Sequence, residues 1–405
     1  MSEVGNSRTA LDFFAGSGLV SEGLSPFFAT IWANDICEKK AAVFCANHSW
    51  KAFTLGPIEG VKGERLPEAE LSWASFPCQD LSLAGNMRGI SAERSGLVWH
   101  WLRIMDEMGE RRPPVLAAEN VAGLVSAEGG AHYRLLHNAL VERGYKVGAL
   151  LLDAVHWVPQ SRKRVFVVAV KRDVDTRCME TARPTWCHPR PVQNAAKGLK
   201  DWVWWHLPPP PRRKVSLEDL IDFDAPMDVE DKSSHVLALV PETHRKKIEH
   251  EKRLSVFPGY KRVRNGRQVL ELRFDGVAGC LRTPEGGSSR QFLVIRRDGK
   301  LGTRLLTVRE AAALMGVREG YKIPGTYNDG YRAMGDAVVV PVVRYLSQHL
   351  LAPLADIAGR NECECESGQE AAGIRGKRRN EGERAAVCGP SGHPARAGRG
   401  TTPGT

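Results

Sequence analysis

The sequence TALDFFAGSGLVSEGL, residues 9 to 24, joins a short apolar run to a glycine-containing turn and then to a helical pattern. An apolar run of this length, bounded by turn residues, predicts a strand. Gly16 and Gly18 form the tight turn, which lets backbone N–H groups approach a ligand at the carboxyl edge of a sheet. The third glycine of a dinucleotide fingerprint is missing, so an ordinary strand-to-helix turn is the alternative for this motif alone.

The same alternation continues through the first 170 residues. Strands are expected at TALDFF (9–14), ATIWAND (29–35), ELSWAS (70–75), PPVLAAEN (113–120), KVGALLLDAV (146–155) and RVFVVAV (164–170). Helices are expected at CEKKAAVFCANH (37–48), SGLVWHWLRIMDEM (95–108) and AHYRLLHNALVERG (131–144). Strand and helix in alternation predict an α/β fold with a doubly wound, mostly parallel sheet.

The pattern changes from about Lys171 to Leu301, where Pro-rich, aromatic and charged stretches are followed by short strands such as QVLELRF and QFLVIRR. This predicts a second, smaller and irregular domain. The alternation resumes in LLTVREAAALMGV, where Thr307 and Glu310 have the spacing of a capping box, and an apolar helix is expected at DAVVVPVVRYLSQHLLAPL. After Gly359 large apolar residues are rare, which predicts disorder. The expected parts are therefore 1–170 and 302–358 for the main domain, 171–301 for the second domain, and 359–405 for the tail.

The net charge of +10 is concentrated in one region. Between Lys252 and Arg304 there are 13 Lys or Arg and 4 Asp or Glu, a balance of 13 − 4 = +9. Such a segment is typical of a surface that binds a polyanion. On charge alone, a solvated basic face is the alternative.

The nine cysteines are irregularly spaced and odd in number, which favours reduced thiols over a disulfide framework. Two sets, Cys178 with Cys187 and His188, and Cys363 with Cys365, contain zinc-ligating residue types but lack the paired spacing of a finger or ribbon. We therefore expect no metal site. No apolar run of 18 residues and no signal-peptide pattern is evident, so a cytoplasmic protein without a membrane segment is expected.

Reactive side chains follow several of the expected strands. Asp35 ends WAND, where a carboxylate can bind both hydroxyls of a ribose. Cys78, in FPCQDLSLAG, lies at a sheet edge near a helix start, where a thiol can become a nucleophile; a buried structural cysteine is the alternative. Glu119 ends another apolar strand, where burial raises the pKa of a carboxyl and allows it to donate a proton at neutral pH. A salt-bridged surface glutamate is the alternative there.

In VPQSRKRVFVVAV, the polar residues Gln160, Arg162 and Arg164 alternate as a strand begins. Period two places Arg162 and Arg164 on the same face of that strand. Two guanidinium groups on one face suit a phosphate or a base carbonyl. Because the carboxyl ends of neighbouring strands converge on one crevice, Glu119 is expected near Cys78.

In this order and at this spacing, these motifs resemble those of the DNA (cytosine-5)-methyltransferases. The resemblance covers residues from Thr9 to Leu350 and includes the motifs LDFFAGSG, FPCQDLS, ENV, QSRKR, RLLTVREAAALMG and GDAVVVPV. It implies a Rossmann-like methyltransferase fold, with 171–301 as the target recognition domain and GCLRTPEGGSSRQ as a loop near that domain's end. The chain departs from the family at Pro57, where an Asp is often found, at Asp336 in place of Asn, and at Leu81 in place of Phe. The first two departures are expected to weaken cofactor binding.

The resemblance also implies roles for individual residues. Cys78 attacks C6 of a flipped cytosine, Glu119 protonates N3, Arg164 contacts the base carbonyl, and Arg162 contacts a phosphate or the nucleophile loop. S-adenosylmethionine is the implied cofactor, held by Phe14, Ala15, Gly16, Gly18, Asp35, Ile36, Ile58, Pro77, Leu97, Asp336 and Ala337. The implied DNA contacts are Gln79, Ser82, Gln160, Arg282, Gly287, Ser288 and Arg290.

By the same resemblance, the partner is duplex DNA, the protein is a monomer of the bacterial cytoplasm, and its role is to protect DNA from a cognate restriction endonuclease. Two rivals stay open. One is an RNA cytosine methyltransferase on the same scaffold, which the long basic insert disfavours because reading a groove requires a separate domain. The other is an inactive DNA-binding relative, which the presence of Cys78, Glu119 and both arginines disfavours.

Overall fold

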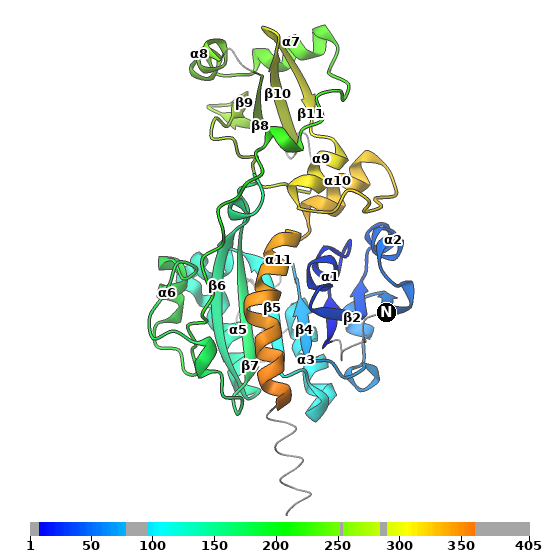
Figure 1. The fold of residues 1–405 in the computed structure, drawn as a ribbon, viewed down its shortest axis with the longest axis vertical. Coiled ribbons are helices and arrows are strands. Elements are labelled where there is room, and N and C mark those ends of the chain that lie inside the picture. Colours follow the sequence, from blue (N-terminus) through cyan, green and yellow to red (C-terminus); the bar gives the residue numbers. More distant parts are fainter. Residues whose placement is uncertain (1–7, 78–95, 252–253, 284–289, 361–405) are drawn as a thin grey trace, which may run out of the picture. The chain divides into compact units, whose positions relative to one another are not determined.

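The computed structural model describes residues 8–77, 96–251, 254–283 and 290–360. This part of the chain contains a large and a small β-sheet (Figure 1). The large sheet has the order β3-β2-β1-β4-β5-β7-β6, and β7 alone runs in the opposite direction to the other strands. Its strands are β1 (Arg8–Phe13), β2 (Phe28–Asp35), β3 (Phe53–Leu55), β4 (Leu71–Ala74), β5 (Val115–Val121), β6 (Tyr145–Asp153) and β7 (Lys163–Lys171). The expected doubly wound, mostly parallel sheet is confirmed.

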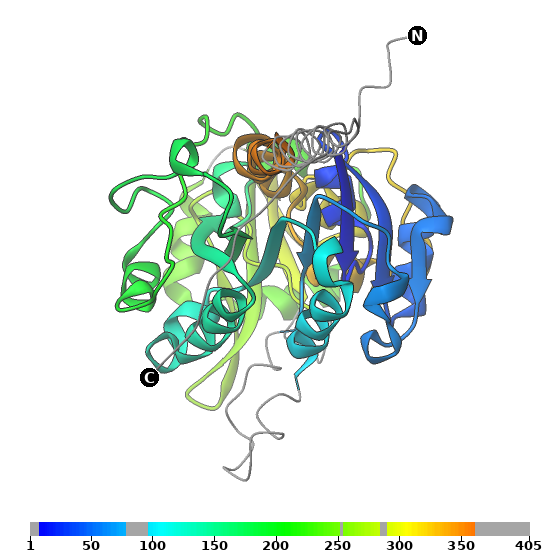
Figure 2. The ribbon, with the colours of Figure 1, turned by 90° about the horizontal axis from the view of Figure 1, so that it is seen from below.

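Both faces of the large sheet are buried, because successive side chains of a strand point to opposite sides. Ala10 belongs to the core that contains residues of α1 (Leu19–Leu24) and α11 (Val340–Leu346). Leu11 and Phe13 belong to the core that contains residues of α3 (Leu97–Met108) and α5 (Ala131–Glu142). Figure 2 shows this arrangement, with the orange C-terminal helix on one side of the sheet and the cyan helices on the other. The helices associated with this sheet are α1 (Leu19–Leu24), α2 (Glu38–Asn47), α3 (Leu97–Met108), α4 (Gly123–Ser126), α5 (Ala131–Glu142), α6 (Arg190–Ala196), α9 (Val308–Leu314), α10 (Tyr327–Gly335) and α11 (Val340–Leu346).

The small sheet is antiparallel, with the order β11-β10-β8-β9. Its elements are α7 (Glu230–Ala238), α8 (Glu242–His250), β8 (Ser255–Arg264), β9 (Arg267–Leu272), β10 (Gln291–Arg297) and β11 (Lys300–Leu305). Sequence patterns predicted β9 and β10 but not β8, whose Pro258 and Gly259 are typical strand breakers. Gly259 is required there, since a Cβ would overlap with Leu272 and the carbonyl of Glu271 on β9.

The segment after β7 packs on the large sheet. Trp205 Nε1 donates to Val168 O at 3.0 Å, and Val203 N donates to Val147 O at 3.0 Å. Gly148 on β6 leaves room for this segment, because a Cβ would overlap with Val203 O. Buried residues as far as Ile221 belong to the large core. Residues 172–221 were expected to belong to the second domain, but they pack on the large sheet. The expected end of that domain at residue 301 lies inside β11 (Lys300–Leu305).

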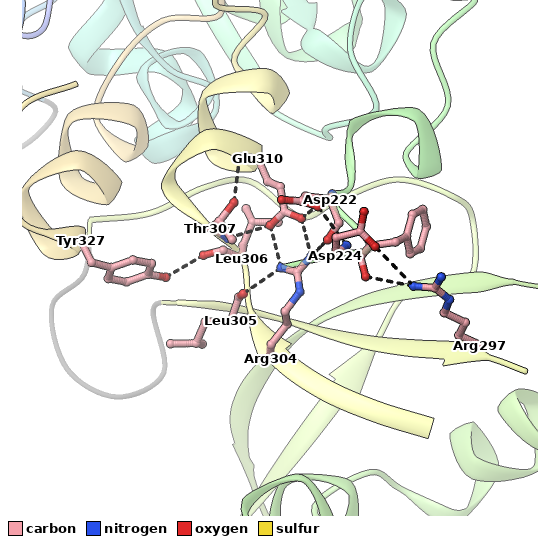
Figure 3. Close-up of polar contacts among 10 residues, drawn as sticks. Asp222, Asp224, Arg297, Arg304, Leu305, Leu306, Thr307, Glu310 and Tyr327 are labelled. Carbon is pink, nitrogen blue, oxygen red and sulfur yellow. Dashed lines mark hydrogen bonds and ion pairs between the residues drawn. The ribbon is translucent and has the colours of Figure 1, made fainter. Parts of the chain in front are cut away.

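A buried ion pair joins the two chain segments that lead into and out of the small sheet (Figure 3). Arg304, on β11, binds both carboxylate oxygens of Glu310, and the two side chains are only 4% and 2% exposed. Arg304 Nη2 also donates to Asp222 O at 2.7 Å, while Asp222 N donates to Glu310 Oε1 at 3.0 Å. Thr307 and Glu310 form the capping box that their spacing predicted. The ion pair therefore fixes the outgoing segment at Asp222 to the returning segment at α9.

One helical stretch, Tyr327–Arg360, has the length and composition to cross a membrane, although no membrane segment was expected from the sequence. Within its apolar window, 67% is buried inside the protein. Leu346, Leu350 and Leu354 are fully or almost fully buried in the core on one face of the large sheet. This is the burial of a core helix.

Candidate active site

A cavity of about 710 Å³ lies at the carboxyl ends of β1, β2, β4 and β5. Ten of the eleven residues expected to hold a cofactor line it, namely Phe14, Ala15, Gly16, Asp35, Ile36, Ile58, Pro77, Leu97, Asp336 and Ala337. Glu119, Arg162, Arg164 and Arg282 line the same cavity. Ligands of doubly wound sheets bind at this edge, so the cavity is the candidate active site.

The turn after β1 forms one wall of the cavity. Phe14, Gly16 and Gly18 have φ values of 59°, 55° and 83°, a region that favours glycine and is unusual for phenylalanine. Gly16 lines the cavity, but Gly18 does not. A Cβ at Gly18 would overlap with His48 and Phe44. Gly18 therefore packs against His48 and Phe44. It was expected to contact the cofactor, but it does not line the cavity.

Asp35 fixes the same turn through its carboxylate. Its Oδ2 accepts from Gly16 N at 2.9 Å, and its Oδ1 accepts from Cys37 N at 2.8 Å. Carboxylate oxygens accept more than one hydrogen bond, so the half-buried group keeps lone pairs for a ligand. Ile36, the next residue, is 69% exposed on the cavity wall, which places an apolar side chain beside a carboxylate.

The side chains of His48 and Tyr321 contact the backbone of this turn. Neither residue belongs to a motif that predicted the site. Tyr321 Oη donates to Ser17 O at 2.6 Å, and His48 Nε2 lies 3.0 Å from Gly18 O. Burial lowers the pKa of His48. They lie 273 positions apart in the chain, so no local pattern connects them.

Glu119 and Arg164 meet within the cavity. Glu119 is 8% exposed, and its Oε1 lies 3.0 Å from Arg164 Nε. Burial raises the pKa of the Glu119 carboxyl, while attraction to Arg164 and Arg162 opposes the rise. The two side chains come from β5 and β7, which pair antiparallel. Two residues expected at the site, Glu119 and Arg164, therefore lie together.

Arg162 is bound almost entirely by the protein itself. Its Nη1 lies 3.3 Å from Cys280 Sγ and donates to Leu281 O at 2.9 Å; its Nη2 donates to Gly335 O at 2.9 Å and Ala337 O at 2.7 Å. Only Nε has no partner among the described residues. Burial lowers the pKa of this guanidinium to about 10, so it stays charged at neutral pH. These bonds leave no Nη hydrogen for the expected phosphate contact, and Arg162 instead joins two loops that line the cavity.

Two expected DNA contacts have other partners. Gln160 is fully buried: its Nε2 donates to Leu314 O at 2.8 Å, and its Oε1 accepts from Leu281 N at 3.1 Å. The side chain of Gln160 therefore has no exposed surface in this structure for the expected DNA contact, and it bonds to the protein backbone instead. Arg290 is half-buried and donates to Asn328 Oδ1 at 2.7 Å. Arg282 is exposed at the cavity and lies 5.8 Å from the centre of the Tyr260 ring.

Several expected site residues lie outside the described residues. They are Cys78, Gln79, Ser82, Gly287 and Ser288, together with the departure at Leu81; the possible zinc pair Cys363 and Cys365 and the tail from residue 361 onward also lie there. Pro77, which precedes Cys78, lines the cavity. Among the described residues, no group of three or more His, Cys, Asp or Glu side chains is arranged to hold a metal ion.

The two departures near the cofactor residues have different consequences. Pro57 lines the cavity but has no side-chain polar group, so it supplies no carboxylate there. The charge of Asp336 is paired, since its Oδ2 lies 2.7 Å from Lys40 Nζ. Burial of Lys40 opposes its charged form, but attraction to Asp336 prevails and the pKa of Lys40 is raised. The sequence placed a charge near the cofactor at Asp336, and in the structure Lys40 pairs with that charge.

Comparisons with known proteins agree with the geometry. The sequence matches the family described as C-5 cytosine-specific DNA methylase over residues 9–352. It is 24% identical over 357 residues to the type II methyltransferase M.MspI of Moraxella sp, covering 88% of this chain and 70% of that protein. It is 25% identical over 345 residues to the type II methyltransferase M.HhaI of Haemophilus parahaemolyticus, covering 84% and 93%.

The fold is similar to that of the Dnmt2 methyltransferase of S. pombe, with a TM-score of 0.57 and 19% identity over 86% of this chain and 99% of that one. It is also similar to a putative DNA modification methyltransferase encoded within an E. coli prophage, with a TM-score of 0.51 and 18% identity over 85% and 98% of the two chains. Because the family match spans most of the chain, the protein belongs to the C-5 cytosine-specific DNA methylases and is a DNA (cytosine-5-)-methyltransferase.

Proposed function

We propose that this enzyme transfers a methyl group from S-adenosylmethionine to C5 of a cytosine flipped out of duplex DNA, through a covalent adduct with Cys78. The observation that carries the proposal is the meeting of two residue sets in one cavity. Ten expected cofactor residues and the side chains of Glu119, Arg162 and Arg164 line the same space. A methyl transfer needs donor and acceptor in one enclosed site.

The cavity residues fit S-adenosylmethionine. Asp35 offers a carboxylate to ribose hydroxyls, and Ile36 with Ile58 offers apolar surface to an adenine. Gly16, with its φ of 55°, lets the backbone approach the ligand more closely than a residue with a side chain would. When bound, S-adenosylmethionine supplies an electrophilic methyl group. The protein's part is to bind it and to activate the acceptor carbon.

Cys78 activates the acceptor by adding to it. Its thiolate forms a bond to C6, while Glu119 gives a proton to N3, and C5 becomes a carbon nucleophile. After C5 has taken the methyl group, a base removes the C5 proton. The C6–S bond then breaks, which returns Cys78 as a thiolate, and N3 gives its proton back to Glu119. The cytosine must leave the stack, because C6 is inaccessible inside a duplex.

Glu119 is suited to protonate N3 because of where it lies. Burial raises the pKa of its carboxyl, so a larger fraction is protonated near neutral pH than for an exposed glutamate. Arg164 Nε, 3.0 Å from Glu119 Oε1, orients the carboxyl and presents its guanidinium to the base carbonyl. Arg162 positions the two loops around this pair.

The small sheet is the proposed target recognition domain. The segment 171–301 was expected to form it; we propose that it begins after Ile221, before α7, and continues to Leu305 at the end of β11. Lys261, Arg262 and Arg264 lie on β8 of this sheet and suit DNA phosphates. Arg282 at the cavity edge is a proposed DNA contact. We further propose a monomer of the bacterial cytoplasm that protects DNA from a cognate restriction endonuclease.

The experiment that tests the covalent mechanism uses duplex DNA with 5-fluorocytosine, whose C5 cannot release a proton. With S-adenosylmethionine, the wild type should form an adduct that resists denaturant, and Cys78→Ser should form none. Bisulfite sequencing of plasmid DNA from an expressing host identifies the target to incorporate. If active protein gave no adduct on that target, the covalent mechanism would be wrong. An adduct on RNA but not on DNA would favour an RNA substrate.

A further inference from the structure

Lys40 and Asp336 place one positive and one negative charge side by side on the cavity wall. Lys40 Nζ lies 2.7 Å from Asp336 Oδ2, and the two side chains are 20% and 29% exposed. Both residues line the cavity, and they come from α2 and from the end of α10. The pair is therefore accessible to a ligand in the cavity while being partly shielded from water.

The pair lies beside the glycine turn. Lys40 Cδ is 3.8 Å from the position that a Cβ on Gly16 would occupy, and Asp35 Oδ2 is 4.0 Å from the same position. The Lys40 stem and the Asp35 carboxylate thus flank Gly16. Asp336 Oδ1 accepts a hydrogen bond from the Thr283 hydroxyl. The two carboxylate oxygens of Asp336 are thus held by different partners, Oδ1 by Thr283 and Oδ2 by Lys40.

The other charges that line this part of the cavity have different positions or partners. Glu119 and Arg164 bind each other, and Arg162 is surrounded by backbone carbonyls. Arg282 lies over the ring of Tyr260. Asp35 and Glu59 also line the cavity, and Asp35 accepts from the backbone of Gly16 and Cys37. Lys40 and Asp336 are therefore a pair of opposite charges that lies beside the glycine turn.

We infer that Lys40 and Asp336 form the subsite for the amino-acid end of the methyl donor, with Lys40 binding its α-carboxylate and Asp336 its α-ammonium. This inference rests on the proposed use of S-adenosylmethionine. If Asp35 held the ribose, the pair beside the glycine turn would be in place to hold the amino-acid end. A zwitterion presents one charge of each sign, and the pair presents the complement at hydrogen-bonding separation.

Charge balance explains why the two residues occur together. The donor carries a positive sulfonium, so an unpaired lysine in the cavity would repel it. Asp336 cancels that repulsion, while an unpaired aspartate would leave a partly buried charge without compensation. The substitution of Asp for the usual Asn at 336 is thus matched by a lysine at 40, and the two together are expected to bind the donor.

The test compares two ligands by isothermal titration calorimetry. S-adenosylhomocysteine has the amino-acid end, and 5′-methylthioadenosine lacks it. Lys40→Met should weaken binding of S-adenosylhomocysteine about tenfold or more, as expected for loss of a charge-assisted hydrogen bond, and should leave 5′-methylthioadenosine within about twofold. The affinity ratio of the two ligands is therefore the measured quantity.

Two matched variants serve as controls. Lys39 is adjacent on α2 and forms a pair of the same length, 2.7 Å, with Asp329 on α10, but it does not line the cavity. Lys39→Met should leave the ratio unchanged. Arg282→Met tests the other cation of the cavity edge and should also leave the ratio unchanged. If Arg282→Met lowered the ratio and Lys40→Met did not, the carboxylate would be assigned to Arg282 and the inference overturned.

The outcomes separate this inference from the proposed function. Wild-type protein that binds neither ligand would contradict the use of S-adenosylmethionine itself. Wild-type protein that binds both, together with a Lys40→Met variant that weakens both equally, would show that Lys40 only supports the cavity wall. Lys40→Arg keeps the charge and should restore most of the affinity ratio. A Lys40→Arg protein that folds and binds 5′-methylthioadenosine, but whose affinity ratio stays as low as that of Lys40→Met, would also count against the subsite.

Discussion

Arg164 Nε lies 3.0 Å from Glu119 Oε1, and the two residues reach each other from neighbouring antiparallel strands. Because they act as one unit, Glu119→Gln and Arg164→Met should each lower kcat by about 100-fold or more. The double variant should be little worse than either single variant. Rates of methyl transfer to duplex DNA from a radiolabelled donor measure this.

A matched control for that pair is Arg172→Met. Arg172 pairs with Asp201 at 2.9 Å outside the cavity, so its loss should leave kcat within about twofold. If the fold-decrease in kcat of the double variant equalled the product of the two single decreases, Glu119 and Arg164 would act independently.

Asp35→Ala should raise KM for S-adenosylmethionine about tenfold or more and change kcat little. The Asp35 carboxylate accepts from Gly16 N and Cys37 N, and we propose that it binds the ribose. Because the ribose does not react, this contact should stabilise the ground state and the transition state equally, so its loss should raise KM and not lower kcat. Steady-state kinetics at saturating DNA would show the split. A fall in kcat at unchanged KM would contradict the assigned role.

Tyr321→Phe removes only the hydroxyl that donates to Ser17 O at 2.6 Å beneath the glycine turn. We expect KM for S-adenosylmethionine to rise several-fold, because the turn is held less rigidly, while KM for DNA stays unchanged. Tyr133→Phe is the control: Tyr133 is also buried and its hydroxyl also lies near a histidine, His137, at 3.3 Å, but it does not line or support the cavity. An equal effect from Tyr133→Phe would show a general loss of packing.

Asp12→Asn should flatten the dependence of stability on pH. Burial raises the pKa of Asp12 from 3.8 to about 7, and Oδ1 has no partner among the described residues. Between about pH 4 and pH 7 the unfolded chain has lost this proton and the folded protein keeps it, so the wild type loses about 1.4 kcal/mol of unfolding free energy per pH unit from this group. That contribution is fully present below pH 4 and is lost as the pH rises through 7. Urea unfolding from pH 5 to pH 8 measures the slope, and equal slopes in both proteins would disprove the assignment.

Arg304→Met should lower the free energy of unfolding by about 3–5 kcal/mol, because it leaves the buried Glu310 carboxylate without its cation. Arg318→Met is the control, since its pair with Glu22 is partly exposed and should contribute under about 1 kcal/mol. The double variant Arg304→Met/Glu310→Leu should recover part of the loss. No recovery would mean that Arg304 stabilises the protein through its bond to Asp222 O and not through Glu310.

Strand and helix positions in the large sheet were predictable because they depend on local periodicity. The runs at 9–14 and 164–170 are strands β1 and β7 with shifts of a residue or so. β8 was missed because its proline and glycine break the local pattern, while its pairing with β9 and β10 is non-local. The packing of residues after 171 on the large sheet was not visible in the sequence for a similar reason, since Trp205 binds the large sheet through a partner 37 residues away.

The sequence by itself determined the family motifs, the alternating fold and the identity of the reactive side chains, because each depends on residues a few positions apart. Only the tertiary structure decided what those side chains face. Gln160 and Arg162, expected at DNA, bind backbone carbonyls more than 100 residues away, and Lys40 meets Asp336 across nearly 300 residues. Burial and pairing depend on all neighbours in space, so a motif shows which group is present but not which partner its charge or hydrogen bond will have.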